Sequence, residues 1–185
     1  MIRILDKDDF DAVADLIVSR QQFLGVAQEH LEMHRKFSAA NAKDLLRAGP
    51  AIGNIIASEE DGILTGALFT LVSLQQPCYY VNKAYTRPGA ELSTLANLFD
   101  ATIQHYEELG YNRFYTMYKK ANVAAYHRLW KTTAILKNYI RYTELELDVH
   151  ERPKFADYWE LLCGRQLYMD PMVIRAFIRK TDDMI

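Results

Sequence analysis

The spacing of apolar residues along the chain predicts an alternation of strands and helices. From Phe10 to Val18, apolar positions recur every three or four residues, which places them on one face of a helix. From Glu144 to Leu147, polar and apolar residues alternate, which is typical of a half-buried strand. The expected strands are 2–5, 54–58, 63–73, 79–85, 111–118, 136–149 and 172–179. The expected helices are one from residue 10 and those at 28–48, 91–109, 122–131 and 154–163.

The turns between these elements indicate a mixed sheet. Asp61-Gly62 between two β-rich stretches predicts a hairpin, and Arg87-Pro88-Gly89 separates a strand from a helix. Strands that follow one another without a helix pair antiparallel, whereas the strand–helix–strand unit at 79–118 predicts a parallel pair at the centre. We therefore expect an α/β fold of the α+β type, with a mixed, mainly antiparallel sheet flanked by helices.

We expect one domain over residues 1–185, with a core at about 1–150 and a C-terminal helix–strand extension at about 151–185. If the last strand is exposed, its edge can pair with a second copy, so a homodimer is one expected assembly.

Charge and composition exclude several classes. A net charge of -2 and a pI near 6.2 disfavour a nucleic-acid partner. No run approaches the roughly 18 apolar residues of a membrane span, and the start of the chain lacks the apolar segment of a signal peptide. We therefore expect a cytoplasmic protein with no membrane partner. The two cysteines, Cys78 and Cys163, exclude a disulfide scaffold and are expected to be unreactive. Neither Gly-x-Gly-x-x-Gly nor Gly-Lys-Ser/Thr occurs, which excludes two common nucleotide-binding motifs.

Four local patterns point to one enzyme family. They are the strand and acidic helix start at 2–9, the hairpin that ends in Gly66-Ala67-Leu68, the strand–loop–helix stretch from Tyr80 to Leu98, and the helix start Asn122-x-x-Ala125. Over about residues 1–150, this order resembles the GNAT superfamily, the acyl-CoA-dependent N-acyltransferases. The resemblance implies a GNAT-like fold, with acetyl-CoA as cosubstrate. It also implies transfer of the acetyl group by direct attack of an amine, carried by a small molecule or a peptide.

The phosphate-binding loop departs from the family pattern. GNAT proteins have Arg/Gln-x-x-Gly-x-Gly/Ala there. Here Arg87 takes the first position, but Ala90 replaces the first glycine and Leu92 the second. Both side chains hinder the approach of phosphate to backbone N–H groups. Ser93 and Thr94 either contact phosphate or cap the helix. The resemblance assigns cofactor binding to Tyr85, Arg87, Gly89, Ala90, Ser93, Thr94 and Asn122.

Acyl transfer to an amine needs an acid for the leaving thiolate and a base for the ammonium. The position of the family's usual tyrosine holds Leu129, so Tyr126, one turn earlier, is the candidate acid. Core packing is its alternative role. His127 is the candidate base, directly or through water, and a surface histidine is the alternative. Glu59 and Glu60 at the hairpin turn are expected to be solvated.

A basic stretch also fits an anionic ligand. Residues 111–141 contain no acidic residue and seven basic ones, Arg113, Lys119, Lys120, Arg128, Lys131, Lys137 and Arg141. In a GNAT-like fold this stretch runs along the cofactor side, where it would attract the phosphates of coenzyme A. A solvated basic face is the alternative.

No metal is expected. His30 and His34 have the i, i+4 spacing that can hold zinc, but Glu32 lies on the opposite side of the helix and no third ligand is evident.

Two other functions stay open. The altered loop also fits a non-catalytic binding or regulatory protein that keeps the fold. A cleft widened by Tyr79, Tyr80 and Tyr85 would fit a different acyl donor, such as a longer acyl-CoA or an aminoacyl carrier.

Overall fold

A computed structural model describes residues 1–73, 76–90, 92–147 and 172–181 of the chain. The strands are β1 (Ile2–Ile4), β2 (Ile55–Glu60), β3 (Ile63–Val72), β4 (Cys78–Thr86), β5 (Arg113–Lys119), β6 (Tyr139–Leu147) and β7 (Met172–Arg179). The helices are α1 (Phe10–Phe23), α2 (Gln28–Ala48), α3 (Leu92–Glu108) and α4 (Val123–Thr132). Short 3-10 helices span Lys7–Asp9, Lys120–Asn122 and Ile135–Asn138. The predicted order of these elements is confirmed, whereas the helix predicted at 154–163 lies outside the described residues.

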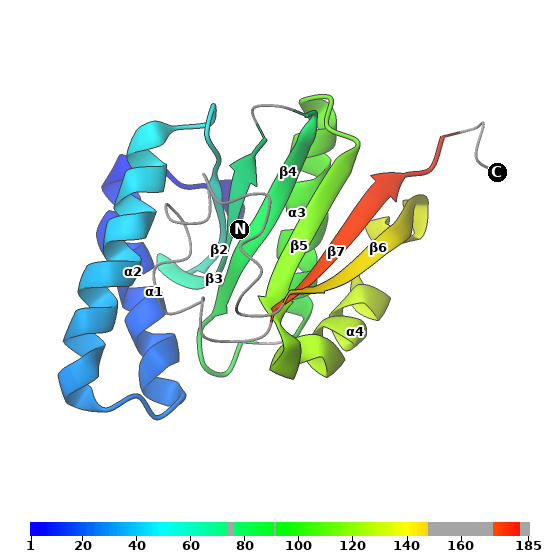
Figure 1. Cartoon of the computed structure of the whole chain (residues 1–185). Coiled ribbons are helices and arrows are strands. Elements are labelled where there is room, and N and C mark those ends of the chain that lie inside the picture. The colour runs from blue at the N-terminus through cyan, green and yellow to red at the C-terminus, as the bar shows by residue number, and fades with distance from the viewer. Residues whose placement is uncertain (74–75, 91, 148–171, 182–185) are drawn as a thin grey trace.

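The seven strands form one mixed sheet in the order β1-β2-β3-β4-β5-β7-β6. Only β4 and β5 are parallel, and every other neighbouring pair is antiparallel. Helix α3 connects the two parallel strands, as the strand–helix–strand unit predicted. The sheet is therefore mixed and mainly antiparallel, with its parallel pair at the centre (Figure 1).

The last strand lies inside the sheet. Strand β7 pairs with β5 on one side and with β6 on the other. The strand of the expected extension is therefore part of the main sheet, and the condition of an exposed last strand is not met. Local pattern does not encode this position, because it depends on pairing with a strand far away in sequence. The edges of the described sheet are β1 and β6, so β7 offers no free edge for pairing with a second copy. The reason given for expecting a homodimer therefore no longer applies.

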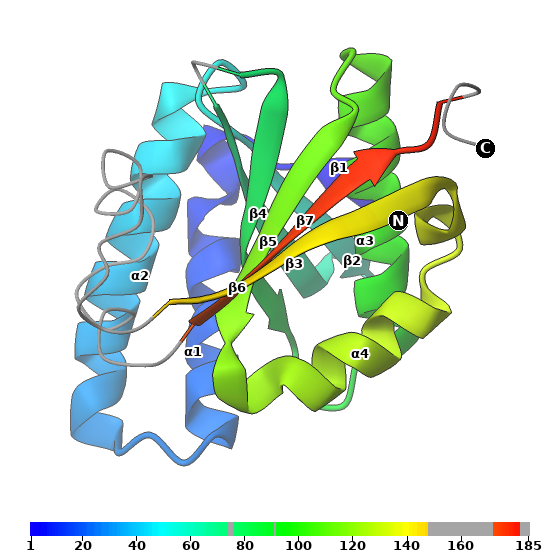
Figure 2. The ribbon, with the colours of Figure 1, turned by 45° about the vertical axis from the view of Figure 1, so that its right-hand side comes forward.

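Two helical layers cover the sheet. Helices α1 and α2 lie on one face and α3 and α4 on the other (Figures 1 and 2). Leu16, Ile17 and Leu45 pack under the first layer, and Leu98 and Phe99 under the second. All five side chains are buried, and each contributes roughly 1.5–3 kcal/mol to the free energy of folding. No helix in the described part of the chain is long and apolar enough to cross a membrane.

Two glycine positions show why the local fold follows the sequence. Asp61 and Gly62 have φ values of 49° and 78°, the positive angles of a tight hairpin turn, so the predicted hairpin between β2 and β3 is confirmed. Gly53 lies against the backbone of β3. A Cβ atom at Gly53 would lie 2.0 Å from the carbonyl oxygen of Thr70, so only glycine fits this approach.

Candidate functional site

Strands β4 and β5 pair with each other over only part of their length. Their ladder runs from Cys78 opposite Arg113 to Val81 opposite Thr116. Beyond this point β4 stays paired with β3 as far as Thr86, and β5 stays paired with β7. We call the region where β4 and β5 do not pair with each other, residues 82–86 of β4 and 117–119 of β5, the β4–β5 fork.

A β-bulge accounts for the fork. In the pairing of β4 with β3, Val81 lies opposite Thr70 and Lys83 lies opposite Phe69, the residue next to Thr70. Asn82 therefore has no residue opposite it and is an extra residue in β4. A bulge bends its strand, and here the bend occurs where β4 and β5 stop pairing. The facing backbone groups of the fork make no β4–β5 ladder bonds, so an extended ligand with amide groups can pair with them.

Two helices begin beyond the ends of the fork. Helix α3 starts at Leu92, six residues after the end of β4, and α4 starts at Val123 after the 3-10 helix that follows β5. The first turn of a helix presents unpaired backbone N–H groups and a partial positive charge. The fork thus has at its open end two helix N-termini that favour an anion.

The turn between β4 and α3 is held by Arg87. The backbone N–H of Arg87 donates to the carbonyl oxygen of Thr65 at 2.8 Å, and its Nε donates to that of Leu64 at 3.0 Å. The N–H of Ala90 donates back to the carbonyl oxygen of Arg87 at 3.0 Å, and Gly89 has a φ of 84°. Nε of Arg87 thus fastens the turn to β3.

The first turn of α3 carries an apolar side chain. Leu92 is 47% exposed, and Ser93 is also exposed. The methyl group of Thr94 points at β3, since a Cβ at Gly66 would lie 3.3 Å from it. Packing is therefore a role that Thr94 fulfils in this structure. The structure thus places an exposed leucine in the first turn of α3.

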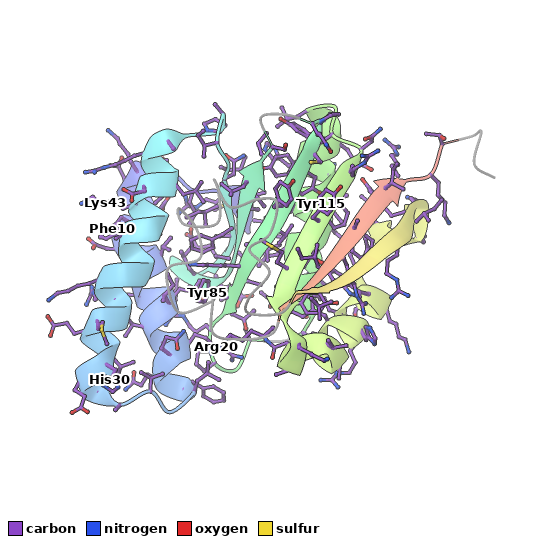
Figure 3. The ribbon with its side chains drawn as sticks, viewed as in Figure 1. Phe10, Arg20, His30, Lys43, Tyr85 and Tyr115 are labelled. Atoms are coloured by element: carbon purple, nitrogen blue, oxygen red, sulfur yellow. The ribbon has the colours of Figure 1, made fainter. Side chains whose placement is uncertain are left out.

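Aromatic side chains line the α1/α2 face of the two central strands. Tyr85 meets Phe69 edge to face at 5.5 Å between ring centroids, and Tyr80 stacks on Tyr115 at 5.2 Å. Figure 3 shows Tyr85 on β4 and Tyr115 on β5. Tyr79 points to the opposite face and is buried in the core. The expectation that Tyr79 lines a cleft with Tyr80 and Tyr85 is therefore wrong, because consecutive strand residues point to opposite faces.

Tyr126 lies between α4 and β5. Its ring stacks on Tyr118 at 4.1 Å with an interplanar angle of 9°, and it also contacts Trp130. Burial, and secondarily the neighbouring Tyr118, raises the pKa of the Tyr126 phenol well above its ordinary value. Leu129, at the family's tyrosine position, is buried in the core. Tyr126 thus has both the expected packing contact and a place beside the last residues of the fork.

His127 is bound to an arginine that the sequence interpretation missed. Nη2 of Arg175, on β7, lies 2.6 Å from Nε2 of His127, and the guanidinium carbon lies 5.7 Å from the ring centroid of Tyr118. Arg175 is fully buried, with 0% of its surface exposed. An arginine flanked by apolar residues in the middle of β7 is a signal for such a buried site, but no neighbouring residue in the sequence identifies its partner. We call Tyr118, Tyr126, His127 and Arg175 the α4 cluster.

The remaining candidates are distributed along the chain's basic stretch. Asn122 precedes α4, is exposed, and makes no side-chain cap bond to the helix. Lys119 and Lys120 stand at the end of β5, beside the fork, and Arg128 and Lys131 are exposed on α4. By contrast, Arg113 begins β5 at the far end of the strand. Only part of the basic stretch is thus on the side of the fork.

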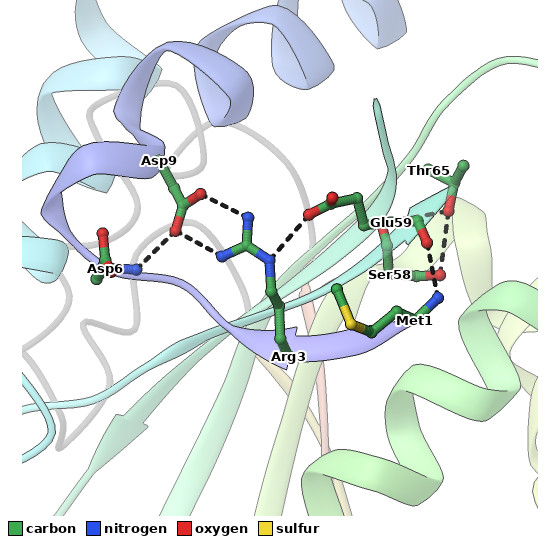
Figure 4. Close-up of polar contacts among 7 residues, drawn as sticks. All are labelled: Met1, Arg3, Asp6, Asp9, Ser58, Glu59 and Thr65. Atoms are coloured by element: carbon green, nitrogen blue, oxygen red, sulfur yellow. Dashed lines mark hydrogen bonds and ion pairs between the residues drawn. The ribbon is translucent and has the colours of Figure 1, made fainter. Parts of the chain in front are cut away.

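The acidic candidates for a base lie elsewhere. Oε2 of Glu59 accepts from Nε of Arg3 at 2.8 Å, while the two outer nitrogens of Arg3 donate to both carboxylate oxygens of Asp9 (Figure 4). This ion-pair network at the sheet edge, rather than solvation, occupies Glu59. Glu60 is exposed at the end of β2, as expected.

The other titratable candidates show no constellation for catalysis. Figure 3 shows His30 close to the start of α2, and its side chain is exposed; the side chain of His34 is not among those described. The described residues include no group of three His, Cys, Asp or Glu that could hold a metal ion. Cys78 is buried, with its sulfur 3.8 Å from the hydroxyl of Tyr80, and Cys163 lies outside the described residues.

Comparison with known proteins identifies the fold. The sequence matches no protein-family model and no curated protein. Among solved structures, a probable acetyltransferase from Staphylococcus epidermidis has a TM-score of 0.67 at 12% identity, covering 98% of this chain and 99% of its own. The PaiA N-acetyltransferase of Thermoplasma acidophilum, solved in complex with coenzyme A, has a TM-score of 0.62 at 10% identity, and the match covers 94% of this chain and 96% of its own. A GNAT-family acetyltransferase from Bacillus cereus has a TM-score of 0.59 at 13% identity, and the match covers 98% of this chain and 97% of its own.

The chain therefore has the GNAT fold, and the resemblance that the sequence suggested is confirmed at the level of the fold. At these identities the similarity concerns the fold alone. Activity has to be argued from the fork, the helix N-termini and the α4 cluster of this chain.

Proposed function

We propose that this chain of GNAT fold is an N-acyltransferase that transfers the acetyl group of acetyl-CoA to an amine by direct attack. The β4–β5 fork carries the proposal. There the two parallel strands stop pairing with each other, at the carboxyl end of the pair, with the N-terminus of α3 beyond it. The coenzyme A complex of the PaiA enzyme supports this choice of donor.

The fork suits the pantetheine arm of coenzyme A better than the start of α3 suits its pyrophosphate. The pantetheine arm carries amides, which can pair with backbone groups of the fork, where β4 and β5 do not bond to each other. The pyrophosphate is favoured by the N-terminus of α3 and by Arg87, but Ala90 and Leu92 narrow its approach. Lys119 and Lys120 add positive charge beside the fork. The fit therefore supports binding of the donor with a weakened phosphate contact.

Each chemical requirement has a candidate group. Backbone N–H groups near Lys83 and Tyr85 are placed to donate to the carbonyl oxygen of the thioester, where negative charge develops. Tyr126 is our candidate for returning a proton to the leaving thiolate, because a phenol is protonated at neutral pH and so has a proton to give. The acceptor is an amine, on a small molecule or a peptide.

One observation favours a second function. The exposed Leu92 in the first turn of α3 fits a GNAT-fold protein that has lost coenzyme binding and acts as a binding or regulatory protein. The two functions differ in whether coenzyme A stabilises the folded chain, so one measurement separates them.

The experiment is thermal unfolding of the wild-type chain with acetyl-CoA, coenzyme A or ATP. A ligand at about 100 times its dissociation constant adds about 2.7 kcal/mol to the free energy of unfolding. For a domain of this size the midpoint then rises by roughly 5–10 °C. A rise with both coenzymes and not with ATP supports the acyltransferase and justifies a screen of amines. No rise at millimolar coenzyme contradicts it.

Variants of Leu92 show whether this side chain limits donor binding. We expect Leu92→Ala and Leu92→Gly to bind coenzyme A more tightly than the wild type, because they open the approach to α3. The matched control is Leu109→Ala, which removes an equally exposed leucine just beyond the other end of α3. If both Leu92 variants bind no better than the wild type, the side chain is not the obstacle.

A further inference from the structure

The bond between Arg175 and His127 fixes how the imidazole carries its proton. A guanidinium has only donors and stays charged at all pH values at which a protein is folded. Nη2 of Arg175 therefore donates to Nε2 of His127, at 2.6 Å. Nε2 must be the unprotonated nitrogen of the ring. His127 is thus neutral, and its single proton is on Nδ1.

The Nδ1–H group of His127 is not engaged within the described part of the chain. Among the described residues, His127 has no hydrogen bond other than the one to Arg175. The residue as a whole is exposed. The ring is therefore bound through Nε2 to a buried cation, and its Nδ1–H group has no partner among the described residues.

The surroundings hold this arrangement in place. Arg175 lies on the middle strand of three, between Thr116 of β5 and Glu144 of β6 in register. Tyr118 lies under the guanidinium, and Tyr126, the neighbour of His127 on α4, stacks on Tyr118. A fully buried arginine cannot turn away to solvent, so its donor stays aimed at α4.

We propose that His127 serves as a neutral hydrogen-bond donor, through Nδ1–H, to an oxygen of the acyl donor bound at the fork, and that Arg175 is the positioning residue that fixes this tautomer. The proposal rests on the proposed function for the identity of the ligand. It replaces the expected role of His127 as general base, because its only lone pair is engaged by Arg175. The cationic partner polarises the ring and strengthens the Nδ1–H donor.

The tautomer is measured without any ligand, by long-range ¹H–¹⁵N NMR of the histidine rings at pH 7.5. The spectrum of His127→Gln assigns the His127 signals among the five histidines. We expect Nδ1 to be protonated and Nε2 to be unprotonated in the wild type. In Arg175→Met, we expect the mixed, mainly Nε2–H signals of a free imidazole. A wild-type ring that is doubly protonated or carries its proton on Nε2 overturns the proposal.

The ligand contact is measured with His127→Gln and His127→Ala. A glutamine amide can accept from Arg175 and donate onward, but it cannot act as a base at neutral pH. We expect His127→Ala to weaken the binding of coenzyme A roughly 5-fold or more, and His127→Gln to recover most of that affinity. The matched control is His30→Gln, an exposed histidine at the start of α2, which should bind as the wild type does.

Kinetics separate a donor from a base. With a donor, His127→Gln keeps most of kcat and leaves the acidic limb of the pH–rate profile in place. If His127→Gln loses turnover as completely as His127→Ala while both bind coenzyme A normally, His127 is a base and the proposal is wrong. A wild-type chain that does not bind coenzyme A overturns the proposed function and the ligand contact, whereas the NMR spectrum decides the tautomer independently.

Discussion

The hydroxyl groups of Tyr106 and Thr70 meet at 2.7 Å in the core, between α3 and β3. Asn54 completes this buried network. Its side-chain nitrogen donates to the hydroxyl oxygen of Tyr106 at 3.2 Å. Its backbone carbonyl oxygen accepts from the hydroxyl of Thr70 at 2.9 Å. The neighbouring Tyr79 stacks on Tyr106 at 3.9 Å, but its buried hydroxyl has no hydrogen-bond partner among the described residues. Two adjacent tyrosines therefore differ in what their hydroxyl groups contribute.

We expect Tyr106→Phe to lower the free energy of unfolding by about 1–2 kcal/mol, because Asn54 loses a buried acceptor. Tyr79→Phe removes a hydroxyl that is buried without a bond, so it should leave stability unchanged or raise it. Urea unfolding of both variants measures the difference. Equal losses in the two variants would contradict the assigned network.

Gly53 gives a prediction about backbone contact. We expect Gly53→Ala to destabilise the chain by several kcal/mol or to prevent folding, because the new Cβ would overlap the carbonyl oxygen of Thr70. The control is Gly25→Ala, which meets no atom within 4 Å and suffers only from its φ of 79°, at about 1 kcal/mol. Thermal unfolding distinguishes them. A Gly53→Ala variant as stable as Gly25→Ala would mean that β3 can move aside.

The ion-pair network at the sheet edge predicts a pH dependence. The hydrogen bonds from Arg3 to Asp9 lower the pKa of that carboxyl group. The folded carboxyl thus holds its proton less tightly than the unfolded one. The stabilisation is fully present above about pH 4 and is lost as the pH falls through the lower folded value.

Asp9→Asn should therefore cost about 1 kcal/mol at pH 7 and make the decline of stability below pH 4 less steep than in the wild type. The control is Asp15→Asn, because Asp15 forms an exposed ion pair with Arg35 at 3.4 Å, which should contribute little. Urea unfolding from pH 2 to 7 measures both. An unchanged acid decline in Asp9→Asn would show that Asp9 is not the group responsible.

Tyr126→Phe tests the proposed acid. The ring and its stack on Tyr118 are retained, so stability and affinity for coenzyme A should stay close to the wild-type values. If the phenol returns a proton to the thiolate, turnover should fall about 100-fold or more. Steady-state kinetics with a reactive amine measure kcat and KM separately. Unchanged turnover would leave Tyr126 with a packing role only.

The pH profile of the same reaction gives a second readout. Burial raises the pKa of Tyr126, so the phenol keeps its proton at a higher pH than a free tyrosine does. We expect any alkaline loss of turnover that comes from Tyr126 to begin above the titration range of free tyrosine and to disappear in Tyr126→Phe. A loss in the range of a free phenol would place the titrating tyrosine elsewhere.

The sequence was informative where structure depends on neighbouring residues. The helix predicted at 28–48 matches the bounds of α2, and Asp61-Gly62 predicted the hairpin. Neighbouring residues are also decisive at Tyr79 and Tyr80. Because side chains alternate along a strand, these two residues cannot both line one cleft.

Structure that depends on distant residues was not predictable in this way. Arg175 and His127 are separated by 48 positions, and neither neighbourhood indicates the other. The fork depends on a bulge at Asn82, which appears only when β4 is paired with β3. The altered residues Ala90 and Leu92 were visible in the sequence, but the anchoring of Arg87 to Leu64 depends on how β3 and β4 lie together.

The place of β7 in the sheet imposes an order of assembly. Strand β6 is joined to the rest of the sheet only through β7, although β6 comes first along the chain. Until β7 inserts, β5 keeps an open edge and β6 has no partner in the sheet. A growing polypeptide can complete the β1–β5 portion early, but the α4 cluster forms only when Arg175 arrives with the last strand. The α4 cluster, which holds the proposed acid Tyr126, therefore forms only after β4 and β5 of the fork have been synthesised.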